Sequence, residues 1–137
     1  FEEPPAEMKL FRPRLVRRMI GDGVAFEIGS MRWMPIKLFH GEEPILGFRI
    51  GRLAYCTDVS RIPEESFEPL KDLDVLVLDA LQHKKHLTHF SLSEAVEAAR
   101  RIGAKQTLFT HIAHALEHNT TNRELPPTMR LTCPFRL

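Results

Sequence analysis

Short apolar runs that end on a polar residue recur along this chain of 137 residues. Three of these runs lead directly into a residue able to bind a metal or move a proton: 53–57 into Asp58, 75–78 into Asp79, and 107–110 into His111. Continuous apolar runs of this length are typical of buried strands, and open sheets collect their chemistry where the strands finish. The pattern therefore predicts one polar cluster along one edge of a sheet, as expected of a metal-dependent enzyme.

The first half of the chain is predicted to be rich in strands. A basic segment over 10–19 is predicted to be an edge strand, because its proline, Pro13, has no place in the middle of a sheet. Further strands are expected over 24–28, 31–39, 45–50 and 53–57. Gly51 and Arg52 separate the last two, which predicts a hairpin.

The second half is predicted to alternate helix and strand. Pro63 suits the first turn of a helix running to about Leu73, which Pro69 would kink or end early. Ser91 and Glu94 fit a capping box; they open a helix with an apolar stripe that stops at Gly103. The remaining expectations are strands over 75–78, 105–110 and 129–132 and a short helix or turn over 111–118. Together these elements predict one α/β domain with a mixed sheet over residues 1–137.

Composition narrows the class of protein. A formal net charge of +1 offers no electrostatic case for binding nucleic acid or a membrane surface. No apolar stretch approaches the roughly 18 to 20 residues of a transmembrane helix. Two cysteines, Cys56 and Cys133, are too few for a disulfide framework; we interpret them as reduced thiols of a cytoplasmic protein, with a single bridge left open.

Histidine is unusually concentrated, with six of the seven between positions 83 and 118. His111 is either a strand-end histidine satisfied by a backbone carbonyl or a metal ligand, and we favour the ligand. His114 and His118 have the spacing of a pair that binds zinc on a helix, but equally that of a solvated face. Asp58 lies in a Thr-Asp-Val-Ser turn. Taken alone, an aspartate in such a turn is more often a turn or helix-capping residue than a functional one.

His89 precedes the predicted helix cap Ser91 by two residues. Its ring should therefore lie near the free amides of that helix, which attract anions and favour a neutral imidazole. Such a histidine could contact a phosphate or protonate a leaving oxygen, or could simply face water in a basic loop. His40 follows a strand and precedes Gly41, which is a weak signal alone. Asp79 either supports a ligand from behind or is structural, and we favour the structural role.

Taken in order, these segments resemble the C-terminal half of the metallo-β-lactamase-fold hydrolases, in the branch with tRNase Z and the PhnP-type cyclic-phosphate phosphodiesterases. The resemblance covers most of positions 36–118. It rests on Phe39-His40-Gly41, Ile45 to Ile50, Ala54 to Asp58, Leu78 to Leu81, Thr88 to Leu92 and Thr110 to His114. It implies the C-terminal half of an αββα sandwich with a mixed sheet.

By that resemblance, His40, Asp58 and His111 are metal ligands, with Asp58 bridging two ions. His89 is the histidine that binds no metal, contacts the scissile phosphate and assists the leaving group, and Ser91 helps to bind the substrate. The implied cofactors are two divalent ions, zinc or manganese. The implied substrate is a small cyclic or nucleotide-like phosphodiester. No role is carried over to His83, His86, His114 or His118.

One part of the family pattern is missing, because no His-x-His-x-Asp-His motif occurs in the chain. We therefore expect a partial domain that binds one ion or none by itself. An N-terminal half, a partner chain or a second copy would supply the rest. The alternatives are a thioester, lactone or β-lactam hydrolase of the same fold, and a non-catalytic fragment or interaction module.

Overall fold

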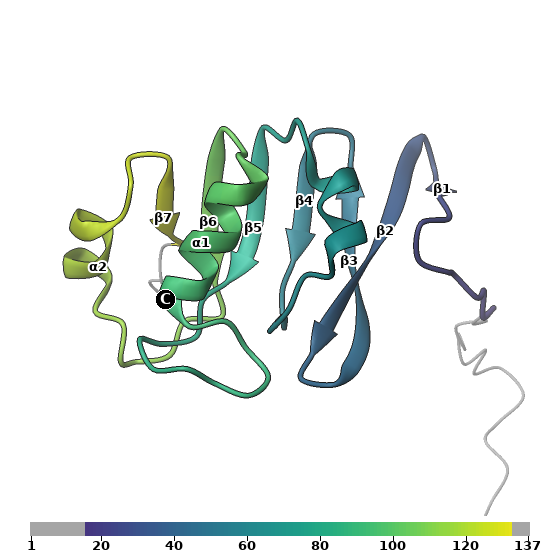
Figure 1. The fold of residues 1–137 in the computed structure, drawn as a ribbon. Helices are drawn as coiled ribbons and strands as arrows, with labels where there is room; N and C mark the ends of the chain where they lie inside the picture. Colours follow the sequence, from purple (N-terminus) through teal and green to yellow (C-terminus); the bar gives the residue numbers. More distant parts are fainter. Residues whose placement is uncertain (1–15, 133–137) are drawn as a thin grey trace, which may run out of the picture.

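The computed structural model describes residues 16–132, which form one mixed sheet with helices beside it (Figure 1). The seven strands follow one another in chain order across the sheet. They are β1 (Phe26–Ile28), β2 (Met31–His40), β3 (Glu43–Ile50), β4 (Leu53–Cys56), β5 (Val75–Asp79), β6 (Gln106–Thr110) and β7 (Met129–Leu131). The helices are α1 (Leu92–Ile102) and α2 (His118–Glu124), with two 3-10 turns, η1 (Glu64–Ser66) and η2 (Glu68–Leu70).

Strand direction determines where the polar ends gather. β1 to β4 pair antiparallel, whereas β4 to β7 pair parallel. β2 is antiparallel to β3, which is antiparallel to β4, so β2 points the same way as β4, β5 and β6. The carboxyl ends of these four strands therefore lie at one edge of the sheet, as the apolar runs predicted.

One face of the sheet carries the core. Residues alternate along the strands, so that every second side chain is buried: Ala54 and Cys56 on β4, Leu76 and Leu78 on β5, Thr107 and Phe109 on β6. α1 packs on this face through its predicted apolar stripe, and Ala95, Ala99 and Ile102 are buried there. The η turns lie over the same face beside α1 (Figure 1). This layer holds the strand ends in a fixed relation to the start of α1.

The opposite face of the sheet is more open. Leu53 and Tyr55 of β4 are exposed, at 39% and 53%, and Val77 and Leu108, which continue the row across β5 and β6, are half-buried. Within residues 16–132, no helix or strand covers this face. The described residues thus form one α/β layer of the predicted αββα sandwich, without its second sheet.

The helix predicted from Pro63 to Leu73 is wrong. The segment forms the two 3-10 turns instead, with Pro69 opening the second. Proline has no N–H, and in a helix its ring meets the carbonyl four residues earlier. A continuous helix across Pro69 is therefore disfavoured.

The strand predicted over 10–19 is not found in its described part: residues 16–19 form no strand, and the rest lies outside the described residues. The segment 111–118, predicted to be a short helix or turn, contains a turn in which the amide of Leu116 donates to the carbonyl of Ala113. The helix α2 begins at the last residue of that segment, His118. Glu117 caps α2 by accepting from the amides of Asn119 and Thr120. Glutamate is uncommon as an N-cap, so this start had no clear signal.

The capping box and the hairpin are confirmed. Ser91 and Glu94 bond reciprocally at the start of α1, and Gly103 ends the helix with a φ of 71°. β3 and β4 pair antiparallel across Gly51 and Arg52. No helix in the described part of the chain has the length and apolarity to cross a bilayer.

Cys56 is a free, buried thiol at the end of β4. Burial, with a smaller contribution from the nearby Asp79 carboxylate, raises its pKa to about 12. The thiolate is the form that binds metals and attacks electrophiles, so Cys56 serves the core rather than the chemistry. Cys133 lies outside the described residues.

Candidate functional site

Two site residues leave their strands through unusual backbone conformations. Asp58 lies two residues after β4 and His111 directly follows β6; each has a φ of 59°. This left-handed region costs a residue with a Cβ free energy, and such strain gathers at functional sites. Asp72, with a φ of 56°, shows that an aspartate also adopts it in an ordinary turn. The strain matters here because both side chains point to the same place.

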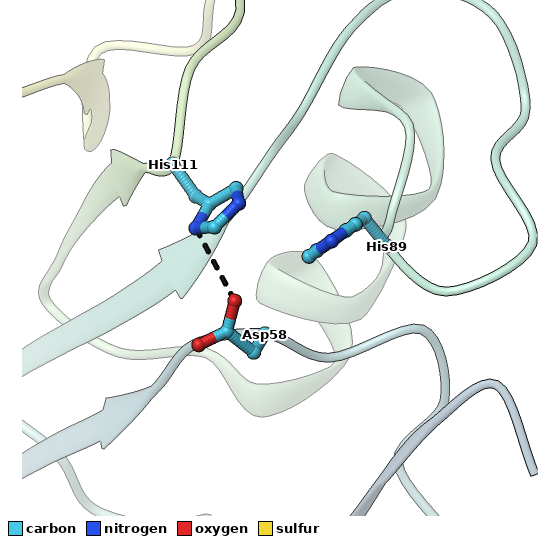
Figure 2. A group of neighbouring side chains, drawn as sticks. All are labelled: Asp58, His89 and His111. Atoms are coloured by element: carbon cyan, nitrogen blue, oxygen red, sulfur yellow. Dashed lines mark ion pairs between the residues drawn. The ribbon is translucent and has the colours of Figure 1, made fainter. Parts of the chain in front are cut away.

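Three side chains converge beyond the carboxyl ends of the strands. One potential ligand atom from each of Asp58, His89 and His111 lies within 4.8 Å of the other two. His111 Nδ1 is 3.3 Å from Asp58 Oδ1, and the rings of His89 and His111 stack with centroids 4.5 Å apart. Figure 2 shows the three side chains reaching this point from separate segments. The predicted polar cluster at one edge of the sheet is therefore present.

The loop that carries His89 is held at its base by backbone hydrogen bonds. The amide of Leu81 donates to the carbonyl of Phe90, and the amide of Leu92 donates to that of Gln82. The amide of Phe90 also donates to the carbonyl of Val59, directly after Asp58. Because of these bonds, a residue far from Asp58 in sequence is fixed beside it.

Asp79 connects the segment after Asp58 to the loop that carries His89. It is fully buried; its Oδ1 accepts from the amide of Val59 at 3.1 Å, and its Oδ2 lies 3.0 Å from His89 Nδ1. One carboxylate thereby positions both the Asp58 turn and the His89 ring. The sequence left two roles open for Asp79, support of a ligand from behind or a structural role, and favoured the second; the contact with His89 supports the first.

The surroundings of Asp79 and His89 favour the uncharged form of each side chain. Burial is the main cause that raises the pKa of Asp79, to about 7. Burial, followed by the neighbouring His40, lowers the pKa of His89 below its usual value. We therefore expect His89 to be a neutral imidazole at neutral pH, with Nδ1 towards Asp79 and Nε2 free to face the site.

His40 joins the cluster from the end of β2. Its Nδ1 lies 2.9 Å from the backbone carbonyl oxygen of Asp58, and its ring centroid is 4.7 Å from that of His89. A histidine with one ring nitrogen on a carbonyl has the other available to a metal, a common arrangement at metal sites. The three side chains whose potential ligand atoms lie within 4.8 Å of one another include His89 but not His40. The ligand set His40, Asp58 and His111 stays a prediction.

Some of the other candidate residues lie beside the cluster and others lie away from it. Ser91 is buried and its hydroxyl is engaged in the capping box with Glu94, so its predicted contact with substrate stays a prediction. The ring of His86 lies 5.3 Å from that of His89. His118 instead lies at the start of α2, with Nε2 3.2 Å from the carbonyl oxygen of Thr132.

The position of Asp79 leads to a first prediction. Asp79→Asn keeps a carbonyl oxygen for the amide of Val59 but replaces the acceptor facing His89 with an amide group. We expect the protein to remain folded while zinc affinity or activity falls about 10- to 100-fold, as when other partners of site histidines are removed. The control is Asp74→Asn, just before the other end of β5, where the carboxylate pairs with Arg52. Equal loss in both variants would refute this role for Asp79.

Comparison with known proteins identifies the family. The model of the β-lactamase superfamily domain matches residues 2–112. The chain therefore belongs to this superfamily, whose fold is that of the metallo-β-lactamase hydrolases. The resemblance inferred from the sequence is confirmed.

Particular relatives refine this placement. A crystal structure described as a new diphosphatase from the PhnP family is 46% identical, with a TM-score of 0.79 over 82% of this chain and 44% of that chain. Human tRNase Z, short form, shares the fold at 20% identity, with a TM-score of 0.59 over 78% of this chain and 41% of its own. An octanoyltransferase of Porphyromonas gingivalis (strain ATCC BAA-308 / W83) is 32% identical over 104 residues, 74% of this chain and 21% of that protein. The chain thus spans less than half of each.

The donor set fits a divalent metal. Imidazole nitrogen and carboxylate oxygen suit zinc and manganese, and here they converge from three segments. The second ring nitrogens of His40 and His89 are bound to a carbonyl and a carboxylate, which is how metal-binding histidines are usually oriented. We conclude that the residues present can contribute to a metal site.

Proposed function

We propose that this chain carries one half of the active site of a metal-dependent hydrolase that cleaves a phosphodiester. The observation that carries the proposal is the convergence of Asp58, His89 and His111 at the carboxyl edge of the sheet. The 46% identity to a PhnP-family diphosphatase supports phosphorus chemistry in particular. A small cyclic or nucleotide-like phosphodiester is the proposed substrate.

His40, Asp58 and His111 are the proposed ligands. When bound there, zinc or manganese would lower the pKa of a coordinated water from about 15.7 to about 7, so that it is nucleophilic at neutral pH. The carboxylate of Asp58, whose Oδ1 lies 3.3 Å from His111 Nδ1, would hold the metal together with that imidazole. The strained turns at Asp58 and His111 hold these groups in place before substrate binds.

His89 is proposed to act on the substrate. Asp79 holds its ring so that Nε2 faces the site, and α1 begins directly behind it. The negative charge of a bound phosphodiester raises the pKa of a nearby histidine. The ring can then hold a proton on Nε2 and donate it to the oxygen that leaves.

Completion of the site requires further ligands. The chain has no His-x-His-x-Asp-His motif and covers 44% of the PhnP-family diphosphatase chain. We propose that an N-terminal half, a partner chain or a second copy supplies the missing ligands, and that this chain alone binds one ion or none. The open face of the sheet around Leu53 and Tyr55 is where the second sheet of the sandwich would pack. We also propose the cytoplasm as its location, consistent with the free thiol of Cys56.

Acyl transfer or hydrolysis is the second candidate. The one observation favouring it is the similarity to a protein named as an octanoyltransferase, although the match covers only 21% of that protein. A thioester, lactone or β-lactam would be the corresponding substrate class. A chain without catalytic activity is the remaining alternative.

Metal content and substrate choice test these proposals together. The complete protein is loaded with zinc or manganese, its metal is counted, and its rates on bis(p-nitrophenyl) phosphate and on an acyl thioester are compared. We expect two ions per site and hydrolysis of the phosphodiester that stops with a chelator and returns with metal. Faster cleavage of the thioester would support acyl chemistry instead. If the complete protein binds no stoichiometric amount of metal, both hydrolase proposals are refuted.

A further inference from the structure

The side chain of Ser60 is bonded to the main chain on both sides of His40. Its hydroxyl accepts a hydrogen bond from the amide of Gly41 at 2.8 Å and donates one to the carbonyl of Phe39 at 3.2 Å. That carbonyl and that amide belong to the two peptide units that flank the α-carbon of His40. One hydroxyl therefore fixes the main chain immediately before and immediately after a proposed metal ligand.

Backbone hydrogen bonds hold Ser60 itself against the end of β2. The amides of Ser60 and Arg61 both donate to the carbonyl of Phe39, at 2.8 Å and 3.3 Å. The amide of Phe39 in turn donates to the carbonyl of Arg61 at 3.0 Å. The guanidinium of Arg61 also lies over the Phe39 ring, 3.7 Å from its centroid. The hydroxyl of Ser60 is thus presented to the strand end from a fixed position.

His40 lies where the chain turns sharply. β2 ends at His40, and Gly41 begins the turn to β3 with a φ of 63°. A Cβ at Gly41 would lie 3.3 Å from the side chain of Thr88, so this turn also approaches the loop that carries the catalytic candidate His89. The ring nitrogen Nδ1 of His40 is 2.9 Å from the carbonyl oxygen of Asp58. With Nδ1 held there, the direction of Nε2 depends on where the main chain places the α-carbon.

The hydrogen bonds of Ser60 also limit how it can act. A serine hydroxyl has one proton to donate, and here it is donated to the carbonyl of Phe39. The oxygen accepts from the amide of Gly41 at the same time. Ser60 is therefore engaged with the main chain and acts on the site through His40.

We propose that Ser60 is a positioning residue that directs Nε2 of His40 towards the metal site. The inference rests on the proposed function and adds to it a residue that touches neither metal nor substrate. Partners that orient metal-binding histidines usually bond to the ring. Here the ring bonds to the carbonyl of Asp58, and Ser60 fixes the main chain that carries the ring. Loss of the hydroxyl should loosen His40 without removing a ligand.

The test compares Ser60→Ala with Ser60→Thr in the complete protein. Alanine removes both hydrogen bonds, whereas threonine keeps the hydroxyl, and Ser60 borders an open hollow that can accept the added methyl group. We expect Ser60→Ala to weaken zinc binding about 10-fold, the lower end of the range for partners of metal-binding histidines, because it acts through the main chain. Ser60→Thr should stay within about threefold of the unmodified protein. With cobalt in place of zinc, the visible absorption bands, which report coordination geometry, should change only in Ser60→Ala.

Ser66→Ala is the matched control. The hydroxyl of Ser66 donates at 2.7 Å to the carbonyl of Lys37, three residues before His40 on the same strand. Both alanine variants lose a serine hydrogen bond to a β2 carbonyl and should lower the melting temperature, but only Ser60→Ala should weaken zinc binding. Unchanged zinc affinity and cobalt bands in Ser60→Ala, or equal losses of affinity in both variants, would show that Ser60 is merely structural.

Nuclear magnetic resonance of the complete protein with its metal removed separates this inference from the proposed function. A carbonyl oxygen can only accept, so the bond from Nδ1 of His40 to Asp58 places the ring proton on Nδ1. The chemical shifts of the ring nitrogens should show this single tautomer in the unmodified protein and in Ser66→Ala, and a mixture of two tautomers in Ser60→Ala. That result would support the positioning role even if no phosphodiester were cleaved. A single tautomer in Ser60→Ala would overturn it.

Discussion

Asp58→Ala should abolish tight binding of divalent metal by the complete protein. The carboxylate of Asp58 lies at the centre of the cluster, 3.3 Å from His111 Nδ1, and its backbone carbonyl oxygen faces His40. Replacing an outer partner of a metal ligand costs about 10- to 100-fold in affinity, so removing a ligand should cost at least about 100-fold. Hydrolysis should fall with the metal content.

Asp72→Ala is the matched control for this change. Asp72 has a similar left-handed backbone, with a φ of 56° against 59° for Asp58, but lies outside the cluster. Both substitutions therefore place an alanine Cβ in the same strained conformation, and both remove one carboxylate. Zinc titration and thermal unfolding are measured for the two variants. Retention of full zinc affinity in Asp58→Ala, or equal losses in both, would contradict the predicted ligand role.

His89→Gln should lower kcat about 10²- to 10⁴-fold, the range for loss of a general acid. Glutamine is polar and similar in reach but cannot exchange a proton at neutral pH. If His89 binds no metal, the metal content of the variant should equal that of the unmodified protein. His83→Gln, an exposed histidine of the same loop, is the control and should be nearly unaffected.

The same variant tests the assignment of roles within the cluster. His89 is 3.0 Å from Asp79 through Nδ1 and also belongs to the group of three potential ligands. Loss of one ion per site in His89→Gln would show that His89 is a ligand, and its predicted role as a proton donor would then be wrong. An unchanged kcat with unchanged metal would remove it from the mechanism altogether.

The edge of the sheet was predictable because the relevant signals are local. Strands such as 75–78 and 107–110 are continuous apolar runs, and parallel pairing brings their ends together. The start of α1 was similarly encoded by Ser91 and Glu94, which satisfy the first amides of the helix. The placement of Asp58 and His111 beyond the ends of their strands followed from these predicted elements.

Other features depend on contacts that no local pattern records. The role of Asp79 arises from hydrogen bonds to Val59 and His89, which lie 20 and 10 residues away in sequence. The start of α2 depends on Glu117, which is an uncommon helix cap. The stacking of Arg61 on Phe39 requires the β2 end and the turn after Asp58 to be side by side. Each is a consequence of tertiary structure.

Anomalous diffraction at the zinc absorption edge from crystals of the complete, zinc-loaded protein tests the central claim most directly. We expect a peak at the carboxyl edge of the sheet, about 2.0 to 2.2 Å from an oxygen of Asp58 and about 2.0 to 2.1 Å from a ring nitrogen of His111. A fully occupied zinc ion bound elsewhere, with these two side chains free of metal, would contradict it.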